Sequence, residues 1–177
     1  MRLALAYPDV FRGALLNAGS DPLGTSDAPL PAPALFDRFE HGSRLVYVSG
    51  TLDASALAAD RASRGSARAL CIANTVVLTI PGGRHEPADG RGFARALDAL
   101  DAPLVDGAGE AACRARRTRA IVREADAIAA LIDAGRLEPA RRRLLAFDAR
   151  WGGLALQASS DIAARLDASP QRVVVRP

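Results

Sequence analysis

The sequence predicts an α/β fold: a partial parallel sheet covered by helices, followed by a C-terminal helical hairpin. Three short apolar runs, at residues 13–18, 43–50 and 74–81, are typical of buried strands. Stretches with apolar residues at helical spacing separate these runs. Because strands that alternate with helices pair in parallel, we expect about three strands in one parallel sheet.

Each predicted strand ends at a residue that interrupts extended structure. Gly19 closes the first run, Gly50 ends the second, and Pro81 ends the third. The second run has the strongest strand composition, because it is mostly aliphatic, aromatic or β-branched. Functional residues of parallel sheets gather beyond the carboxyl ends of strands, so the loops after these runs are the places to search.

Helices are predicted before, between and after the strands, over residues 2–7, 34–39, 54–70 and 90–100. Pro8 stops the first, because proline lacks an amide donor and clashes with the preceding turn. The last is amphipathic, with Phe93, Leu97 and Leu100 on one side. Residues 20–34 are predicted as a loop because prolines recur there.

A change of composition at residues 101–109 predicts a linker between two parts. Residues 1–100 hold the predicted strands, and residues 110–177 form a helical extension with an ambiguous Val-Val-Val tail. Helices are predicted in it over residues 110–134, 137–151 and 159–167. We expect Phe147 and Trp151 to pack in the core of this hairpin, with a platform for a ligand as the alternative, and the hairpin must dock on other structure to be stable.

Charge and hydropathy indicate neither a nucleic-acid partner nor a membrane partner. The net charge of the 177 residues is +3, and every basic residue is Arg. The densest runs, at 114–123 and 141–143, fall in predicted helices, where such runs are typical of a solvated face. No aromatic residues alternate with them as stacking platforms. No apolar run approaches the ~18 residues of a membrane span.

The two cysteines do not predict a metal site. Cys71 and Cys113 are far apart in sequence, without a Cys-x-x-Cys pair or a nearby paired histidine. We expect Cys71 to be a small buried apolar residue, with a disulfide as the alternative. No cofactor or metal is predicted, and the sequence leaves the cellular compartment open.

Asp53 and His85 are the candidate site residues, because both lie in loops just past predicted strands. An aspartate beside a histidine can hold the imidazole in one tautomer and stabilise its charged form. Asp53 also precedes a helical pattern, so the alternative role is a helix N-cap. The alternative for His85 is a residue of a surface loop.

Residues 7–19, Tyr-Pro-Asp-Val-Phe through Asn-Ala-Gly, resemble the segment just after the nucleophile in α/β-hydrolases. Among these hydrolases, the segment resembles notably bacterial esterases similar to polyhydroxybutyrate depolymerases, and prolyl-oligopeptidase-like hydrolases. Gly-Thr-Leu-Asp at 50–53 resembles the loop of the triad acid, and Pro-Gly-Gly-Arg-His-Glu at 81–86 the loop of the triad histidine. The resemblance implies that residues 1–100 are the C-terminal half of a hydrolase domain. It further implies that Asp53 and His85 serve a small ester or acyl substrate without metal or cofactor.

The sequence departs from that family because it contains no Gly-x-Ser-x-Gly, the turn that presents the nucleophilic serine. Ser20 is the one serine considered as a substitute, and Ser-Asp-Pro favours an ordinary turn instead. We therefore expect a fragment or truncated form of a serine hydrolase with little or no activity alone.

The alternative prediction is a non-catalytic interaction module derived from a hydrolase. The exposed edge of a partial sheet is a surface for self-association. The basic helices at 110–151 offer a second surface, for an acidic partner or for self-association.

Overall fold

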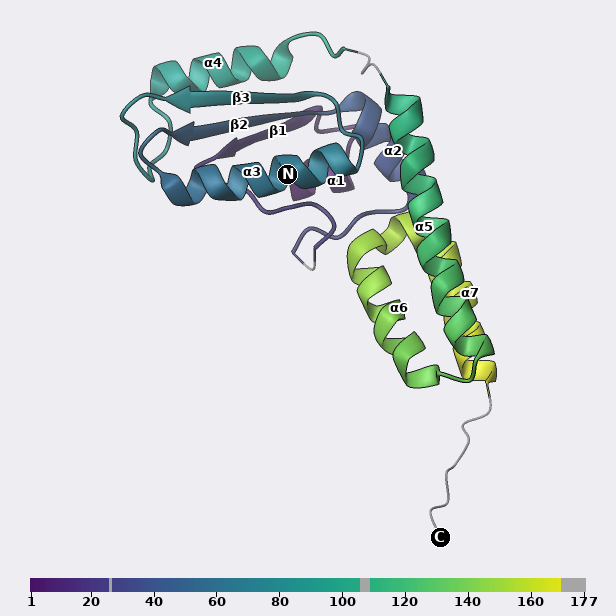
Figure 1. Cartoon of the computed structure of the whole chain (residues 1–177). Coiled ribbons are helices and arrows are strands. Elements are labelled where there is room, and N and C mark those ends of the chain that lie inside the picture. The colour runs from purple at the N-terminus through teal and green to yellow at the C-terminus, as the bar shows by residue number, and fades with distance from the viewer. Residues whose placement is uncertain (26, 106–108, 170–177) are drawn as a thin grey trace.

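The computed structural model describes residues 1–25, 27–105 and 109–169, and its centre is a three-stranded parallel sheet (Figure 1). The strands lie in the order β1 (Gly13–Asn17), β2 (Arg44–Gly50), β3 (Thr75–Ile80). The predicted α/β class is confirmed, and each strand starts and stops within one residue of the predicted run.

All residues of β2 are buried, because helices cover both faces of the sheet. Leu45 and Tyr47 belong to the core on one face, and Val46 and Val48 to the core on the other. Side chains of a strand alternate between faces, so a strand covered on both sides reads as a continuous apolar run. This is why segment 43–50 has the strongest strand composition.

The helices of the α/β part follow the predicted order, namely α1 (Arg2–Ala6), α2 (Pro33–Gly42), α3 (Ala54–Ala69) and α4 (Gly90–Asp101). Helix α4 covers one face of the sheet, and α3 and α1 lie on the other (Figure 1). Helix α2 runs three residues beyond its predicted end at residue 39.

The predicted apolar side of α4 packs on the sheet only in part. Leu100 contacts the core of that face, but Phe93 and Leu97 are 40% and 50% exposed. The fully buried residue is Ala96, whose small side chain lets the helix approach the strands closely.

The C-terminal part contains α5 (Glu110–Asp133), α6 (Leu137–Trp151), a 3₁₀ turn η1 (Gly152–Ala155) and α7 (Leu156–Ala168). Helix α7 starts three residues earlier than predicted. Gly152 adopts a φ of 47°, and a Cβ there would lie 2.9 Å from the carbonyl oxygen of Leu30. The sharp bend after α6 therefore packs directly on the loop before α2.

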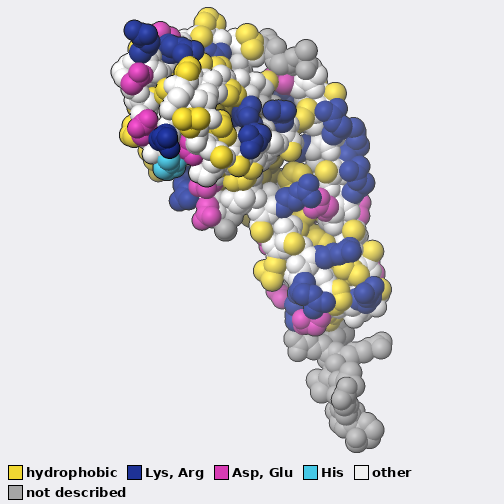
Figure 2. Space-filling view, turned by 60° about the vertical axis from the view of Figure 1, so that its left-hand side comes forward, with side chains coloured by type: hydrophobic (Ala, Val, Ile, Leu, Met, Phe, Trp, Pro, Cys, Tyr) yellow, Lys and Arg dark blue, Asp and Glu magenta, His cyan; other side chains and the backbone are white. Residues whose placement is uncertain are grey.

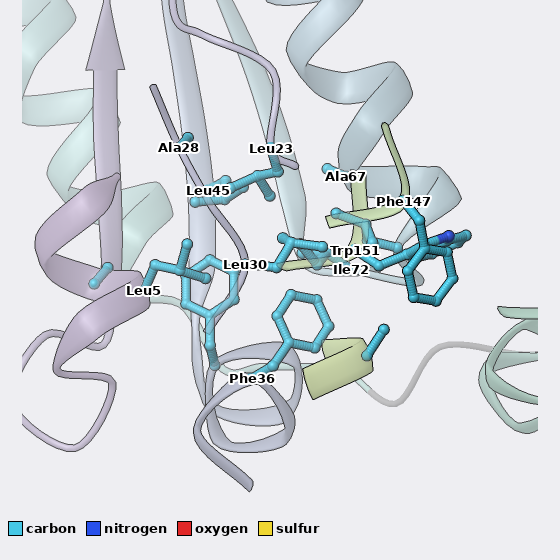
Figure 3. Packing of buried hydrophobic residues seen from close by; sticks show 14 of the residues in the cluster. Leu5, Leu23, Ala28, Leu30, Phe36, Leu45, Ala67, Ile72, Phe147 and Trp151 are labelled. Carbon is cyan, nitrogen blue, oxygen red and sulfur yellow. The ribbon is translucent and has the colours of Figure 1, made fainter. Parts of the chain in front are cut away.

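One apolar core joins the helical part to the α/β part (Figure 3). Phe147 and Trp151 of α6 are buried in the same cluster as Leu30 and Ile72. Their predicted role in the core is confirmed, and the hairpin docks on the loop before α2 and the connection before β3. The proposed linker at 101–109 remains a prediction: α4 includes residue 101, and residues 106–108 lie outside the described residues, as does the tail.

A disulfide between Cys71 and Cys113 links the connection after α3 to the first turns of α5. Cys71 is buried as expected, at 5% exposed, and it forms the disulfide that was given as the alternative. The two cysteines are 42 residues apart, so the cross-link removes about 4 kcal/mol of chain entropy from the unfolded state.

Arg117 corrects the prediction that the arginine run at 114–123 forms a solvated face. Its Nη1 contacts the Oε2 of Glu40 at 3.0 Å and donates to the carbonyl oxygen of Leu70 at 2.6 Å. The guanidinium also lies 5.0 Å from the centre of the Phe36 ring. Glu40 is 2% exposed, and a buried carboxylate is stable only with a paired cation, so Arg117 turns inward.

None of the helices in the described ranges is long and apolar enough to cross a membrane.

Candidate active site

Asp53 and His85 are in direct contact: Asp53 Oδ2 lies 2.7 Å from His85 Nδ1. Asp53 follows β2, and His85 follows β3. These strands are neighbours and run in parallel, with Gly50 and Ile80 paired near their carboxyl ends. The sheet therefore brings together, at the carboxyl ends of its strands, two residues that are 32 positions apart in sequence.

Asp53 caps α3 and contacts His85 with the same carboxylate. Its Oδ1 accepts hydrogen bonds from the Ala56 amide and the Ser55 hydroxyl, each at 3.0 Å, and so caps α3. Its Oδ2 is left for His85. The Ala56 amide is the main reason that the Asp53 pKa lies below its usual value, and His85 and Ser55 add to this effect against desolvation. Asp53 is consequently a carboxylate, which accepts hydrogen bonds only.

His85 is exposed on the side away from the carboxylate. Its side chain is 71% exposed, whereas that of Asp53 is 3% exposed. Since a carboxylate only accepts, Nδ1 of His85 carries the hydrogen that bridges the pair, whether the ring is neutral or charged. In the neutral ring Nε2 then holds the free lone pair, and in the described residues it has no hydrogen-bond partner.

The loop that carries His85 is fixed to the end of β2. The Leu52 amide donates to the Gly83 carbonyl at 2.9 Å, and the Gly82 amide donates to the Thr51 hydroxyl at 2.8 Å. A Cβ at Gly50 would lie 2.2 Å from the carbonyl oxygen of Gly83. Glycine at position 50 is thus required for the two loops to touch.

Asn17, at the end of β1, fixes the other side of the same loop. Its Oδ1 accepts from the Ala88 amide at 3.0 Å, and its Nδ2 donates to the Glu86 carbonyl at 3.4 Å. Sequence reasoning overlooked this residue, although a polar side chain at the end of a predicted strand was an available signal.

A hollow of about 390 Å³ lies along this loop, lined by residues that include Gly50, Arg84, Glu86 and Asp89. His85 does not line it. The imidazole instead faces open solvent. A molecule bound in this hollow, as the described residues form it, would therefore not be placed to react at Nε2.

Ser20 is bound elsewhere. Its hydroxyl donates to Asp60 Oδ1 at 3.3 Å, and the hydroxyl of Ser49 donates to Oδ2 of the same carboxylate at 2.7 Å. Asp60 is buried on α3 and needs these partners. The side chain of Ser20 therefore has a structural role.

In the ranges that the structure describes, no three His, Cys, Asp or Glu side chains gather as a possible metal site. Comparison with known proteins found no matching family model, curated protein or solved structure. The function must consequently be argued from the geometry of Asp53 and His85.

Proposed function

We propose that Asp53 and His85 are the acid and the general base of a serine hydrolase that acts on carboxylic esters. The observation that carries this proposal is the 2.7 Å contact between a buried carboxylate and an exposed imidazole at the ends of neighbouring parallel strands. In such enzymes the carboxylate holds the imidazole so that Nε2 accepts the proton of the serine and later returns it to the leaving group.

The sheet supports the same proposal. Its three strands are parallel in the order β1–β2–β3, and β1 forms one edge. In α/β-hydrolases the serine stands on a strand-to-helix turn, and residues 7–19 resemble the segment that follows this turn. A strand that carries the serine would pair in parallel with the free edge of β1, and its carboxyl end would then lie at the same end of the sheet as the loop of His85.

The proposal requires a serine from outside this sequence. The chain has no Gly-x-Ser-x-Gly, and Ser20 is bonded to Asp60. The members of a triad act as one unit, so the acid and base without the nucleophile give little acceleration. We expect the 177-residue chain alone to show little or no esterase activity.

The test is to read the coding DNA immediately upstream of this sequence. An in-frame Gly-x-Ser-x-Gly is expected, and the longer protein should hydrolyse p-nitrophenyl butyrate. Substitution His85→Ala should lower kcat by at least about 10³-fold, whereas the control His41→Ala should not. Absence of an in-frame serine turn, or full activity in His85→Ala, would refute the proposal.

A second candidate function, self-association as a non-catalytic module, is favoured by an apolar surface beside β1. A groove of about 670 Å³ there is lined by residues that include Val10, Phe11 and Leu104. These three side chains are 72%, 40% and 42% exposed. Exposed apolar surface of this kind is typical of an association site.

Sedimentation equilibrium tests this second candidate. A dimer that Phe11→Asp dissociates, and that the control Leu145→Asp leaves intact, would support the module. Leu145 is a suitable control because it is 70% exposed on α6, in the helical part. A monomer at high protein concentration would exclude self-association.

A further inference from the structure

A groove of about 450 Å³ lies where the end of α3 meets α5 and the end of α6. Asp53 caps the start of α3, so the length of that helix, roughly 24 Å, separates the groove from the acid–histidine pair. Apolar residues form part of its lining, namely Leu23, Leu70, Ala120 and Trp151. Five arginines make up much of the rest of the lining, namely Arg68, Arg116, Arg117, Arg123 and Arg150.

Only two of these five arginines have an acidic partner. Arg117 contacts Glu40 at 3.0 Å, and Arg150 contacts Glu124 at 2.9 Å. The other three, Arg68, Arg116 and Arg123, form no ion pair with any residue that the structure describes. Three positive charges are therefore left uncompensated around one groove.

Helical spacing directs these charges to the same surface. Arg116 and Arg123 are seven residues apart on α5, which is two turns, and Ala120 lies between them on that side. The small side chain of Ala120 leaves space between the two guanidinium groups. Arg68 reaches the groove from the end of α3. Arginine side chains also gather along the helical part on the face shown in Figure 2.

The lining resembles that of a site for a small ligand. A volume of about 450 Å³ falls within the roughly 300–1,000 Å³ of small-molecule pockets. Guanidinium groups bind phosphate and carboxylate oxygens with two parallel hydrogen bonds. The apolar part of the lining offers contact to a hydrocarbon or aromatic group.

We propose that this groove binds a small organic anion of the phosphate-monoester class. Arg68, Arg116 and Arg123 bind the phosphate, and the apolar body packs on Leu70, Ala120 and Trp151. The proposal is independent of the hydrolase proposal, because it uses neither Asp53 nor His85 and stands on a different part of the fold.

Trp151 provides the readout, because it is the single tryptophan of the chain and lines the groove. Its fluorescence should change saturably when the full chain is titrated with phenyl phosphate, and the apparent Kd should rise with salt. Phenol and inorganic phosphate are titrated alongside. Each should bind at least about tenfold more weakly, since each offers only half of the recognised chemistry.

Arg116→Ala/Arg123→Ala should raise the Kd for phenyl phosphate at least about tenfold. The matched control Arg119→Ala/Arg142→Ala removes the same charge from positions outside the groove and should leave the Kd within about twofold. Thermal unfolding of both double variants verifies that they are folded.

An equal loss of affinity for phenyl phosphate in both double variants would show that only net charge matters, and would overturn the proposal. Phenol binding as tightly as phenyl phosphate, or no saturable signal, would overturn it as well. Inorganic phosphate binding as tightly as phenyl phosphate would overturn the part of the proposal that assigns an apolar body. The titration of the unaltered chain decides the question even where a variant does not fold.

Discussion

One carboxylate serves two partners at the start of α3: Asp53 caps the helix through Oδ1 and accepts a hydrogen bond from His85 Nδ1 through Oδ2, at 2.7 Å. The helix cap holds the carboxylate in place independently of its contact with the histidine. The imidazole is thus oriented by a group that the backbone of α3 already holds, although His85 itself is largely exposed.

Asp53→Asn should reverse the tautomer of His85 while keeping the helix cap. The amide oxygen can still accept from Ala56, and the amide nitrogen then donates to Nδ1, so the ring hydrogen moves to Nε2. Nitrogen-15 NMR of the imidazole should show this change of tautomer near pH 8. An unchanged Nδ1–H tautomer would contradict the assigned orientation of the pair.

Asp53→Ala should, in addition, cost about 1 kcal/mol in the free energy of unfolding, because the cap of α3 is lost. The control is Asp89→Ala, which removes the cap of α4, where the Gly92 amide is bound at 2.7 Å. Urea unfolding should show a similar loss for both alanine variants, whereas only the change at Asp53 should alter the NMR signals of His85.

The stability contributed by Asp53 should disappear in acid. Its pKa is lowered below the unfolded value of 3.8 by folding, mainly through the Ala56 amide. A depressed folded pKa means that the stabilisation is fully present above pH 3.8 and is lost as the pH falls through the folded pKa. Urea unfolding between pH 6 and pH 2 should therefore show a steeper acid loss for the unaltered chain than for Asp53→Asn. Parallel curves would contradict the shift.

Reduction of the disulfide should lower the free energy of unfolding by about 4 kcal/mol, because the bond closes a long loop between Cys71 and Cys113. Denaturant unfolding with and without reductant measures the loss. Cys71→Ala, Cys113→Ala and the double variant should lose similar amounts and no longer respond to reductant. An unaltered chain whose unfolding does not respond to reductant would show that Cys71 and Cys113 are not bonded.

The sequence was sufficient for the strands because each is a short apolar run with a breaker at its end, and β2 is buried on both faces. It was also sufficient to direct attention to Asp53 and His85, because parallel strands bring their following loops to one edge. It did not predict the pairing of Arg117 with Glu40. That contact depends on how α5 crosses α2, a packing relationship between positions 77 residues apart that no periodicity encodes.

Arg117→Ala should lower the free energy of unfolding far more than Arg116→Ala does. Glu40 is 2% exposed, and removal of Arg117 leaves it only the more distant guanidinium of Arg114, at 3.8 Å, so the loss should approach the ~3 kcal/mol of a broken buried ion pair. Arg116→Ala, the matched control on the same helix, should change the free energy of unfolding by less than about 0.5 kcal/mol. Adding Glu40→Gln to Arg117→Ala should restore part of the loss, as measured by urea unfolding. No restoration would mean that Arg117 acts through its packing on Phe36.

Asn17 should control the mobility of the loop that carries His85. Asn17→Ala removes the acceptor for the Ala88 amide and the donor to the Glu86 carbonyl, which costs about 1 kcal/mol of local stability.

Amide hydrogen exchange at Ala88 should then accelerate roughly fivefold. Asn17→Asp keeps the acceptor and loses the donor, so its exchange rate at Ala88 should lie between those of the unaltered chain and Asn17→Ala. The amide of Gly92, bound by Asp89 at 2.7 Å, is the internal control and should exchange at an unchanged rate. Equal acceleration at both amides would place the effect in the whole fold, and Asn17 would then be a residue of the sheet edge with no specific hold on the histidine loop.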